Sequence, residues 1–489
     1  MGKVAFLRIR NGSSRDVNVK LENLRNVELN ISTDNGSLGV LAAGSSFPET
    51  SDYQLGGGSG NPLFYHRIEG EPTRRIHKDG YFFVVAAPVD AADKNEESTS
   101  VRLAVDHSKW WSDRNEAHAH HREDGHECKA EGVVIYVDVN APDDDDDDNE
   151  GENPNFKDAY VITVYIYDAI PTADWMAELK GVLASKPLCQ VALPGTHDSG
   201  TYKWDKELGA SPDNDLTSTI QDKLEFGRGI IRKIGSKMTD GILQLIYERL
   251  CRCQNMTTLQ QLQAGIRYLD LRVAATPDGQ SFYTCHGVYC VAMTEVLQEI
   301  RDFLQAHPQE IVLLDFNHFY GMQAEHHEAF AKLLMDTLGD KIATQPCLTP
   351  SSTVQEYWDA QVQAVVIYHD VPTHQASDGK LWHKHTIHSP WPNKNKTKEL
   401  RENLETNVKA RNKNRFFVLQ GILTPDGELI KEEIMESKGS TSIQSIASRV
   451  SGKVVNWVGD EWKEENHNVV IVDFFEDCSM VPAIINLNK

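Results

Sequence analysis

The clearest pattern in the chain is a helical segment, Thr294-Glu-Val-Leu-Gln-Glu-Ile-Arg-Asp-Phe-Leu-Gln-Ala306, followed by a short apolar run, Ile311-Val-Leu-Leu-Asp-Phe316. A second apolar run, Ile266–Val273, precedes the helical segment. Short apolar runs of this length are typical of buried strands. The order strand, helix, strand predicts a βα unit and a parallel sheet.

The same alternation continues in both directions, from about residue 172 to residue 489. Further strand candidates are Cys189–Leu193, Ala364–His369, Phe416–Leu423 and Val469–Phe475. Further helix candidates are Thr239–Leu250, Ala324–Leu338 and Lys398–Arg411. We therefore predict an α/β fold for residues 171–489, an irregular (β/α)8 barrel of the TIM type.

The first 170 residues have a different pattern, and a chain of 489 residues favours two domains. Runs rich in Val, Ile, Tyr and Phe alternate with segments rich in Gly, Asp, Asn and Pro, which predicts an all-β, sandwich-like domain. The strand candidates are Lys3–Arg10, Gly80–Ala87, Val101–Val105, Gly132–Val139 and Tyr160–Asp168.

Charge limits the possible partners. The formal net charge is −23, so the surface repels nucleic acid, and we expect no nucleic-acid partner. The acidic segment 143–152 contains the run Asp143–Asp148 and is predicted to be a solvated loop, with calcium buffering as the alternative. Peripheral contact with an anionic membrane is disfavoured unless Ca²⁺ bridges this loop.

Location and redox state follow from what the sequence lacks. No run of about 20 apolar residues is present, so we expect no transmembrane segment. Arg8 and Arg10 interrupt the first apolar run, so we expect no signal peptide. The eight cysteines are sparse and scattered, and Cys251 and Cys253 are interpreted as ordinary thiols. Together these features predict a cytoplasmic protein.

One cluster in the N-terminal region has metal-ligand chemistry. It consists of His118, His120, His121, His126 and Cys128. Imidazole and thiolate bind zinc and copper, but the spacing matches no standard zinc module. We therefore interpret segment 118–128 as a polar surface loop, with metal binding as the alternative.

Polar residues of the second half gather where the predicted strands end. They are His197, Asp198, Asp270, Arg272, Asp315, Asn317, His369, Asp370 and Asp473. Any one of these could simply end a strand. All of them together predict a site at the C-terminal rim of the barrel, where barrel enzymes place their active sites.

Three segments give this rim its chemistry. In Leu193-Pro-Gly-Thr-His-Asp-Ser199, a turn presents His197 directly after a strand. In Gly265-Ile-Arg-Tyr-Leu-Asp-Leu-Arg272, Asp270 and Arg272 share one face of a strand. In Tyr283-Thr-Cys-His-Gly-Val-Tyr289, a hairpin can return His286 to the same rim. Two histidines can act as base and acid, and an arginine can bind phosphate oxygens, which predicts a phosphodiester site.

These three segments resemble the X region of phosphatidylinositol-specific phospholipases C. The resemblance is closest to the small eukaryotic proteins named for containing only that domain, and next to the secreted bacterial enzymes. Further similar segments are Ala173–Met176, His307–His318, Phe417–Thr424 and Val469–Phe475. The resemblance covers about residues 172–489 and none of the first 170.

The resemblance implies a role for each matched residue. His197 matches the general base that deprotonates the inositol 2-hydroxyl, and His286 matches the acid for the leaving oxygen. Arg272 matches the arginine that replaces calcium in the bacterial enzymes, and Asp198 matches its aspartate partner. Asp473 matches the aspartate that orients the first histidine. Asp270 matches a rim aspartate near the second histidine.

The resemblance also has gaps, which concern substrate binding. Asn317 stands where the bacterial enzymes have a lysine that contacts inositol. Tyr368 and Trp391 are the candidates for the aromatic residue that stacks on inositol. An arginine at position 272 repels a divalent cation, so we expect no metal and no cofactor in catalysis.

The predicted function is therefore that of a metal-independent phosphoric diester hydrolase of the phospholipase C type. Its substrate would be a phospholipid such as phosphatidylinositol or a related water-soluble diester. Two alternatives stay open: a catalytically weak protein that binds lipid or inositol phosphate, and a barrel phosphodiesterase that uses a metal ion. The sequence does not predict a partner for residues 1–170.

Overall fold

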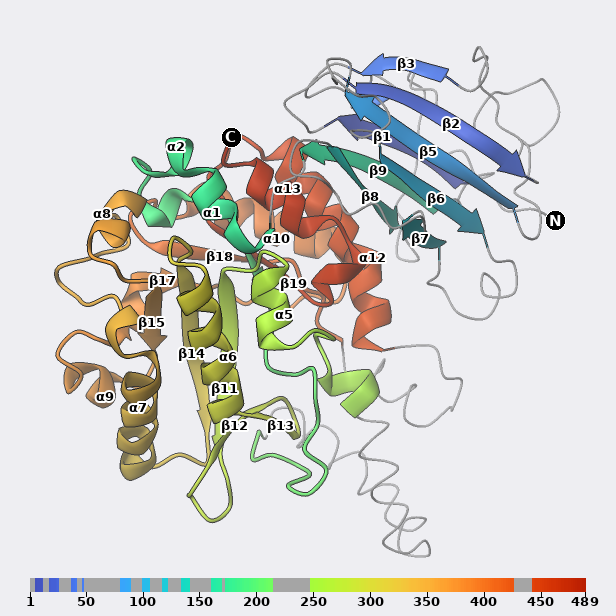
Figure 1. The fold of residues 1–489 in the computed structure, drawn as a ribbon. Helices are drawn as coiled ribbons and strands as arrows, with labels where there is room; N and C mark the ends of the chain where they lie inside the picture. The colour runs from blue at the N-terminus through green and yellow to red at the C-terminus, as the bar shows by residue number, and fades with distance from the viewer. Residues whose placement is uncertain are drawn as a thin grey trace, which may run out of the picture. The chain divides into compact units, whose positions relative to one another are not determined.

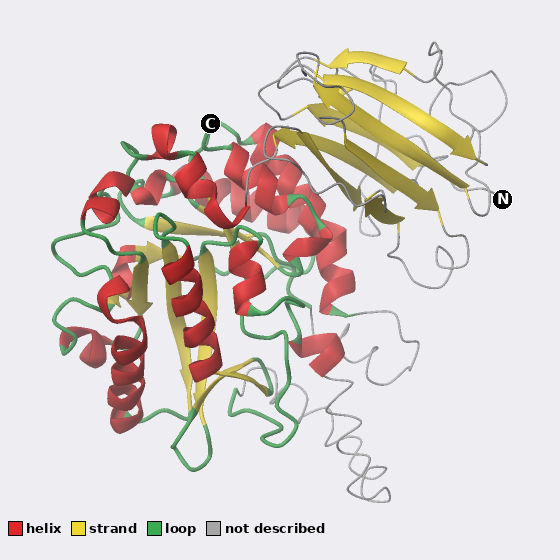
Figure 2. Cartoon of the chain, viewed as in Figure 1, coloured by secondary structure: helices red, strands yellow, loops and turns green. Residues whose placement is uncertain are grey.

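The structure is a computed structural model (Figures 1 and 2). It describes nine strands within residues 5–168, and residues 172–213, 247–425 and 442–489. By compactness the chain divides into two units, one made of 1–171, 448–456 and 476–486, and the other of 172–447, 457–475 and 487–489. The predicted domain boundary between residues 170 and 171 stays a prediction.

The described part of residues 1–168 consists of strands in two sheets. One has the order β4-β1-β9-β8 and the other β3-β2-β5-β6-β7. The strands are β1 (Ala5–Asn11), β2 (Val17–Arg25), β3 (Ser37–Leu41), β4 (Ser46–Phe47), β5 (Gly80–Pro88), β6 (Thr99–Val105), β7 (Ala117–His121), β8 (Val133–Asn140) and β9 (Tyr160–Asp168). The five predicted strands correspond to β1, β5, β6, β8 and β9, and the sandwich packing stays a prediction.

Of the histidine-rich segment 118–128 and the acidic segment 143–152, only part of the first is described. Segment 117–121 forms strand β7 rather than part of a loop, because it pairs antiparallel with β6, with Val101 opposite His121. Residues 122–128, which complete the histidine-rich cluster, lie outside the described residues. The acidic segment 143–152 also lies outside them.

The second unit is built on eight parallel strands in the order β16-β15-β14-β11-β10-β19-β18-β17. They are β10 (Leu193–Thr196), β11 (Tyr268–Ala275), β14 (Val312–Tyr320), β15 (Ala364–Tyr368), β16 (Trp382–His383), β17 (Ile387–His388), β18 (Phe416–Gln420) and β19 (Val469–Val472). Strands β10, β15, β18 and β19 are buried along their whole length, as expected where both faces of a parallel sheet are covered.

The row of strands has two ends, β16 and β17, joined by a single turn, Lys384–Thr386. Between residues 376 and 400, all of which are described, no hydrogen-bonded pair links β16 to β17. The predicted α/β class with a parallel sheet is therefore confirmed, and a closed barrel stays a prediction.

Helices separate the parallel strands (Figure 2). They are α1 (Trp175–Glu178), α2 (Lys180–Leu183), α5 (Thr258–Gln263), α6 (Met293–Ala306), α7 (Ala324–Leu338), α8 (Val354–Asp359), α9 (Val371–Gln375), α10 (Thr397–Ala410), α12 (Ile443–Asn456) and α13 (Met480–Asn486). Helix α6 buries Met293, Val296, Leu297, Ile300, Phe303 and Leu304, the three- and four-residue spacing of an amphipathic helix. None of the helices in the described residues is both long enough and apolar enough to cross a membrane.

The first predicted strand of this unit was placed too early. Residues 188–190 form a 3-10 turn, and the strand, β10, begins at Leu193. The apolar run at 189–193 is buried, but the backbone of Leu188 and Cys189 donates hydrogen bonds to Ser352 and Pro350 instead of to a strand. Of the predicted helix 239–250, only residues 247–250 are described, in a π-helical turn at Tyr247–Cys251.

Candidate active site

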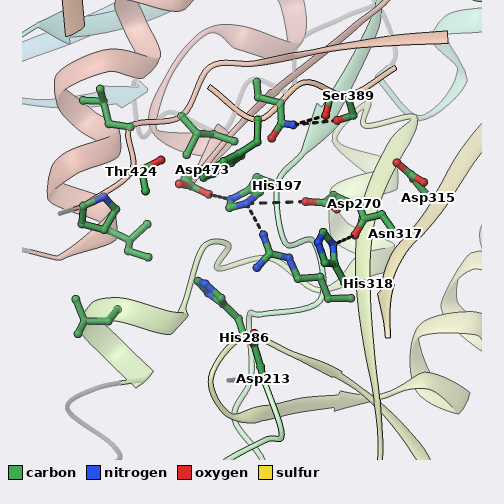
Figure 3. Close-up of a pocket in the computed structure, with 18 of the residues that line it drawn as sticks. His197, Asp213, Asp270, His286, Asp315, Asn317, His318, Ser389, Thr424 and Asp473 are labelled. Carbon is green, nitrogen blue, oxygen red and sulfur yellow. Dashed lines mark hydrogen bonds and ion pairs between the residues drawn. The ribbon is translucent and has the colours of Figure 1, made fainter. Parts of the chain in front are cut away.

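A cavity of about 640 Å³ opens where the parallel strands end (Figure 3). The strand ends supply most of its polar lining, because the side chains that follow parallel strands meet at one edge of the sheet. The polar lining residues are His197, Asp213, Asp270, Arg272, His286, Asp315, Asn317, His318, Tyr320, His369, Ser389, Gln420, Thr424 and Asp473. Apolar residues complete it: Leu250, Trp391, Ile422, Leu423, Pro425 and Ile443.

His197 and Asp473 face each other from two neighbouring strands, β10 and β19. His197 Nδ1 lies 2.8 Å from an oxygen of Asp473 and both side chains are almost fully buried, so Nε2 faces the cavity. The residue after each of them has a positive φ, 42° at Asp198 and 48° at Phe474. Such backbone is strained for residues other than glycine and accumulates at functional sites.

One glutamine holds both turns together. Gln254 donates from its Nε2 to the backbone oxygen of His197 at 2.9 Å and to that of Val472 at 3.1 Å. It is fully buried, so both hydrogen bonds are shielded from water. Gln254 was not predicted from the sequence, because it precedes α5 and belongs to none of the segments that carry the resemblance.

Arg272 is held in the cavity wall by Asp198. Its Nε lies 2.7 Å from Asp198 Oδ1, and its Nη2 lies 3.2 Å from His197 Nε2. Burial alone would raise the pKa of Asp198, but Arg272 first, and then His197 and His286, hold that pKa below its ordinary value. Burial likewise opposes the charge of Arg272, yet Asp198 and then Asp270 raise its pKa, so the guanidinium stays charged.

His197 sits in a strongly acidic environment. Burial by itself would lower its pKa, but the carboxylates of Asp198, Asp473 and Asp270 outweigh burial and raise the pKa to about 9. Asp198 Oδ2 lies 3.4 Å from His197 Nε2 and Asp270 Oδ2 lies 3.9 Å from it. This raised pKa favours the protonated imidazole, whose second proton must leave before His197 can act as a base.

His286 reaches the cavity on a hairpin. Strand β12 (Phe282–Cys285) runs antiparallel to β11 and then pairs with β13 (Tyr289–Ala292), which confirms the predicted hairpin. Gly287 has a φ of 70°, as the tight turn requires. His286 Nδ1 donates to the backbone oxygen of Cys251 at 2.9 Å, which leaves Nε2 to face the cavity.

Asp270 lies in the cavity wall beside His197. Its Oδ2 lies 3.9 Å from His197 Nε2 and accepts a hydrogen bond from the backbone nitrogen of Asp198 at 3.1 Å. This place follows from its register on β11, which runs directly beside β10. Asp270 and His286 line the same cavity, and the predicted closeness of the two stays a prediction. Asn317 donates to the other oxygen of Asp270 and so lies in the same wall.

The two aromatic candidates have different outcomes. Tyr368 is fully buried, contacts Phe316, Phe319 and His327, and lies outside the cavity lining, so its predicted stacking on a substrate is not supported. Trp391 lines the cavity and is 44% exposed. Its ring stacks on that of His197, with centroids 5.5 Å apart.

A second histidine–aspartate pair in the cavity was not assigned a role from the sequence. His369 Nε2 lies 2.9 Å from an oxygen of Asp315, and Tyr268 donates to the other oxygen at 2.8 Å. Asp315 and His369 were both predicted as residues at strand ends, but the ion pair between them was not predicted. Pairing depends on the register between β14 and β15, which a single sequence does not reveal.

Comparison with known proteins identifies the family. Residues 244–370 match the family model described as phosphatidylinositol-specific phospholipase C, X domain. Human PI-PLC X domain-containing protein 3 is 31% identical over 321 residues, which cover 65% of this chain and 93% of that protein. The chain belongs to the PI-PLC X domain-containing protein family. The mouse PI-PLC X domain-containing protein 2 is 32% identical over 321 residues, covering 65% of this chain and 87% of that protein.

Solved structures include similar proteins. One is the phosphatidylinositol-specific phospholipase C from Listeria monocytogenes, with 19% sequence identity and a TM-score of 0.44. The match covers 65% of this chain and 100% of the Listeria chain. Within the PI-PLC X domain match at residues 244–370 lie Asp270, Arg272 and His286. His197 and Asp473 lie outside that range, and their roles stay predictions.

Proposed function

We propose that this PI-PLC X domain protein is a phosphoric diester hydrolase of the phospholipase C type, with His197 as general base and His286 as general acid. The observation that carries the proposal is that both imidazoles and the Arg272 guanidinium lie within 3.6 Å of one buried carboxylate, that of Asp198. In Figure 3, His197 and His286 lie around the same cavity, and Arg272 Nη2 lies 3.2 Å from His197 Nε2.

Each of the three groups presents its reactive atoms to the cavity. Asp473 holds the Nδ1 side of His197 and the Cys251 carbonyl holds the Nδ1 side of His286, so both Nε2 atoms are presented to the cavity. Arg272 uses its Nε for Asp198, and its terminal nitrogens can bind the non-bridging oxygens of a phosphodiester. Charge builds up on those oxygens in the transition state.

The proposed reaction proceeds in two steps. His197 Nε2 takes the proton of a headgroup hydroxyl, whose oxygen forms a new bond to phosphorus. The bond from phosphorus to the lipid alcohol breaks, and His286 Nε2 gives its proton to that leaving oxygen. The product is a cyclic phosphodiester and a neutral alcohol. In the second step water opens the ring, with His286 as base and His197 as acid.

The test is product analysis on a panel of phospholipids and water-soluble phosphodiesters with EDTA present. We expect a cyclic headgroup phosphate from the native chain and no product from His197→Ala or His286→Ala. Thermal melts should show both variants folded. His385→Ala replaces an exposed histidine outside the cavity lining and should keep native turnover.

The outcomes separate the competing functions. Turnover near the native rate in either active-site variant would refute the assignment of base and acid. Activity that disappears with EDTA and returns with Ca²⁺ or Mg²⁺ would instead support a metal-dependent diesterase. Binding of inositol phosphate without any turnover would support a binding protein.

A further inference from the structure

We propose that Cys253, His286 and Asp198 form an inhibitory binding site for a soft divalent cation such as Zn²⁺, directly beneath the catalytic cavity. The sequence suggested no role for Cys253. The structure places its thiol 3.7 Å from His286 Nδ1 and 4.0 Å from Asp198 Oδ2. His286 Nδ1 and Asp198 Oδ2 are 3.6 Å apart, which closes a triangle of one sulfur, one nitrogen and one oxygen.

The size of this triangle fits zinc. Zinc binds sulfur at about 2.3 Å and nitrogen or carboxylate oxygen at about 2.0–2.2 Å in tetrahedral sites. Ligand atoms at these bond lengths and at tetrahedral angles are separated by roughly 3.4–3.6 Å. The three distances in the structure, 3.6, 3.7 and 4.0 Å, need to close by at most a few tenths of an ångström.

The surroundings hold the three ligand groups in place. Cys253 is fully buried, its backbone nitrogen donates to Thr201 Oγ1 at 3.0 Å, and its backbone oxygen accepts from Phe474 at 2.8 Å. Asp198 pairs with Arg272 through Oδ1, which leaves Oδ2 directed at the thiol. His286 lines the cavity, so an ion can enter past its ring.

Charge favours the ion in spite of the nearby arginine. Arg272 repels a cation, but the carboxylates of Asp198, Asp270 and Asp473 all lie close to His197. A thiolate and one carboxylate balance the two charges of Zn²⁺. Binding releases the thiol proton to solvent, and His286 binds as a neutral imidazole with its proton on Nε2, so that its Nδ1 and the thiolate each donate an electron pair to the metal.

The donor set also determines which ions inhibit. Thiolate and imidazole select zinc, copper and cobalt, whereas Ca²⁺ and Mg²⁺ require oxygen ligands. When His286 Nδ1 binds zinc, it no longer donates to the Cys251 carbonyl, and the metal-bound ring does not act as the acid for a leaving oxygen. Zinc therefore switches the site off, while calcium and magnesium leave it unaffected.

The deciding experiment measures binding and needs no turnover. The full chain, freed of metal with a chelator, is titrated with Co²⁺, and the charge-transfer absorption of a cobalt–thiolate bond is recorded. We expect a band that saturates at one equivalent and is removed by Zn²⁺. Cys253→Ser and Cys253→Ala should both lack the band. Cys347→Ser removes an exposed thiol and serves as the matched control, which should keep the band.

Two results would overturn the proposal: no band in the native chain, or a band that persists in folded Cys253 variants. If the proposed function also holds, the zinc concentration that halves turnover should rise at least about tenfold in Cys253→Ala, since even outer-sphere partners of a metal contribute that much. If the native chain binds cobalt through Cys253 but shows no turnover, the metal site is supported and the proposed phosphodiesterase activity is refuted.

Discussion

The charge around His197 determines how the proposed base should respond to pH. Asp198, Asp473 and Asp270 raise its pKa to about 9 against the effect of burial. Because only the deprotonated imidazole can accept a proton, the acidic limb of kcat/KM against pH should extend up to about pH 9. The acidic limb of the profile then reports the His197 pKa in the free protein.

Asp473→Asn tests this assignment directly. Loss of the carboxylate removes the negative charge that stabilises the imidazolium, so the His197 pKa falls and the acidic limb moves to lower pH. The maximum value of kcat/KM should also fall, by roughly 10²–10⁴-fold, because the tautomer that carries its proton on Nδ1 and leaves Nε2 unprotonated is no longer favoured. The measurement is kcat/KM against pH for both proteins.

Asp315→Asn is the matched control for that profile. It removes another buried carboxylate of the same cavity, but one that pairs with His369 and Tyr268 rather than with His197. Its acidic limb should coincide with that of the native chain. If Asp473→Asn also left the limb in place, His197 would not be the group that the profile reports.

At this scale, residue types were predicted well and contacts were not. Strand-end position and family resemblance brought His197, Arg272, Asp198, His286 and Asp473 together, and all five lie in or directly beneath one cavity. Cys253 and Gln254 were missed because their contacts reach across 33 residues or more to other segments, and a single sequence carries no record of such contacts.

The turn after β10 and the hairpin β12–β13 touch at one glycine. A methyl group on Gly200 would lie 2.6 Å from Thr284 Cβ and 2.7 Å from its Oγ1, far inside van der Waals contact. The same threonine donates from Oγ1 to the Gly200 carbonyl at 2.7 Å. This close contact ties the segment that carries His197 to the strand that ends at His286.

Gly200→Ala should therefore push β12 away and displace His286. We expect a loss of kcat of at least about tenfold, because a misplacement of about 1 Å can cost 10² in rate. Gly181→Ala is the control, because a methyl group there meets no atom within 4 Å, and it should keep the native kcat and melting temperature. Rates and thermal melts of the two variants make the comparison. Native kcat in Gly200→Ala would show that the hairpin adapts without cost.

A buried ion pair anchors the first helices to the sheet. Arg267 and Glu310 are both fully buried, with Arg267 Nε donating to Glu310 at 2.8 Å. Glu310 also accepts from the backbone nitrogens of Met176 and Ala177, each at 3.0 Å, at the start of α1. Arg267 donates to the carbonyls of Thr172 and Ala173 as well.

Removal of one partner of this buried ion pair should strongly lower the free energy of unfolding. Glu310→Gln leaves the Arg267 guanidinium uncompensated in the interior and should lower the free energy of unfolding by about 3–5 kcal/mol. Glu461→Gln breaks the exposed pair with Arg401 and should cost no more than about 1 kcal/mol. Urea unfolding of the three proteins measures both differences. Equal losses would mean that the buried pair has no special role.

Among elements, long periodic segments were predicted more reliably than short ones. Helix α7 was predicted at its observed bounds and α6 and α10 within one residue, because an amphipathic helix repeats its signal over several turns. The two-residue strands β16 and β17 were missed, since they are too short to carry a pattern. The strand predicted at 189–193 failed because a buried apolar run does not distinguish a strand from a 3-10 turn.

For the whole molecule, the sequence predicted the classes of structure but not the pairing. The all-β composition of residues 1–170 matches the described strands there, yet β1 pairs in parallel with β9, with Ala5 opposite Tyr160. Such a pair joins segments more than a hundred residues apart, and nothing local specifies it. The relatives do not help here, because the matches to them cover 65% of this chain.

The net charge of −23 leads to a prediction about the substrate surface. An anionic vesicle repels this chain, and salt weakens the repulsion because the Debye length falls from about 30 Å at 0.01 M to about 10 Å at 0.1 M. If the chain cleaves phosphatidylinositol, its rate on anionic vesicles should rise with salt over this range. The rate on a short-chain monomeric substrate should change little, since one charge is much less repelled than a charged surface. A vesicle rate that falls with salt would contradict this expectation and indicate a cationic docking face.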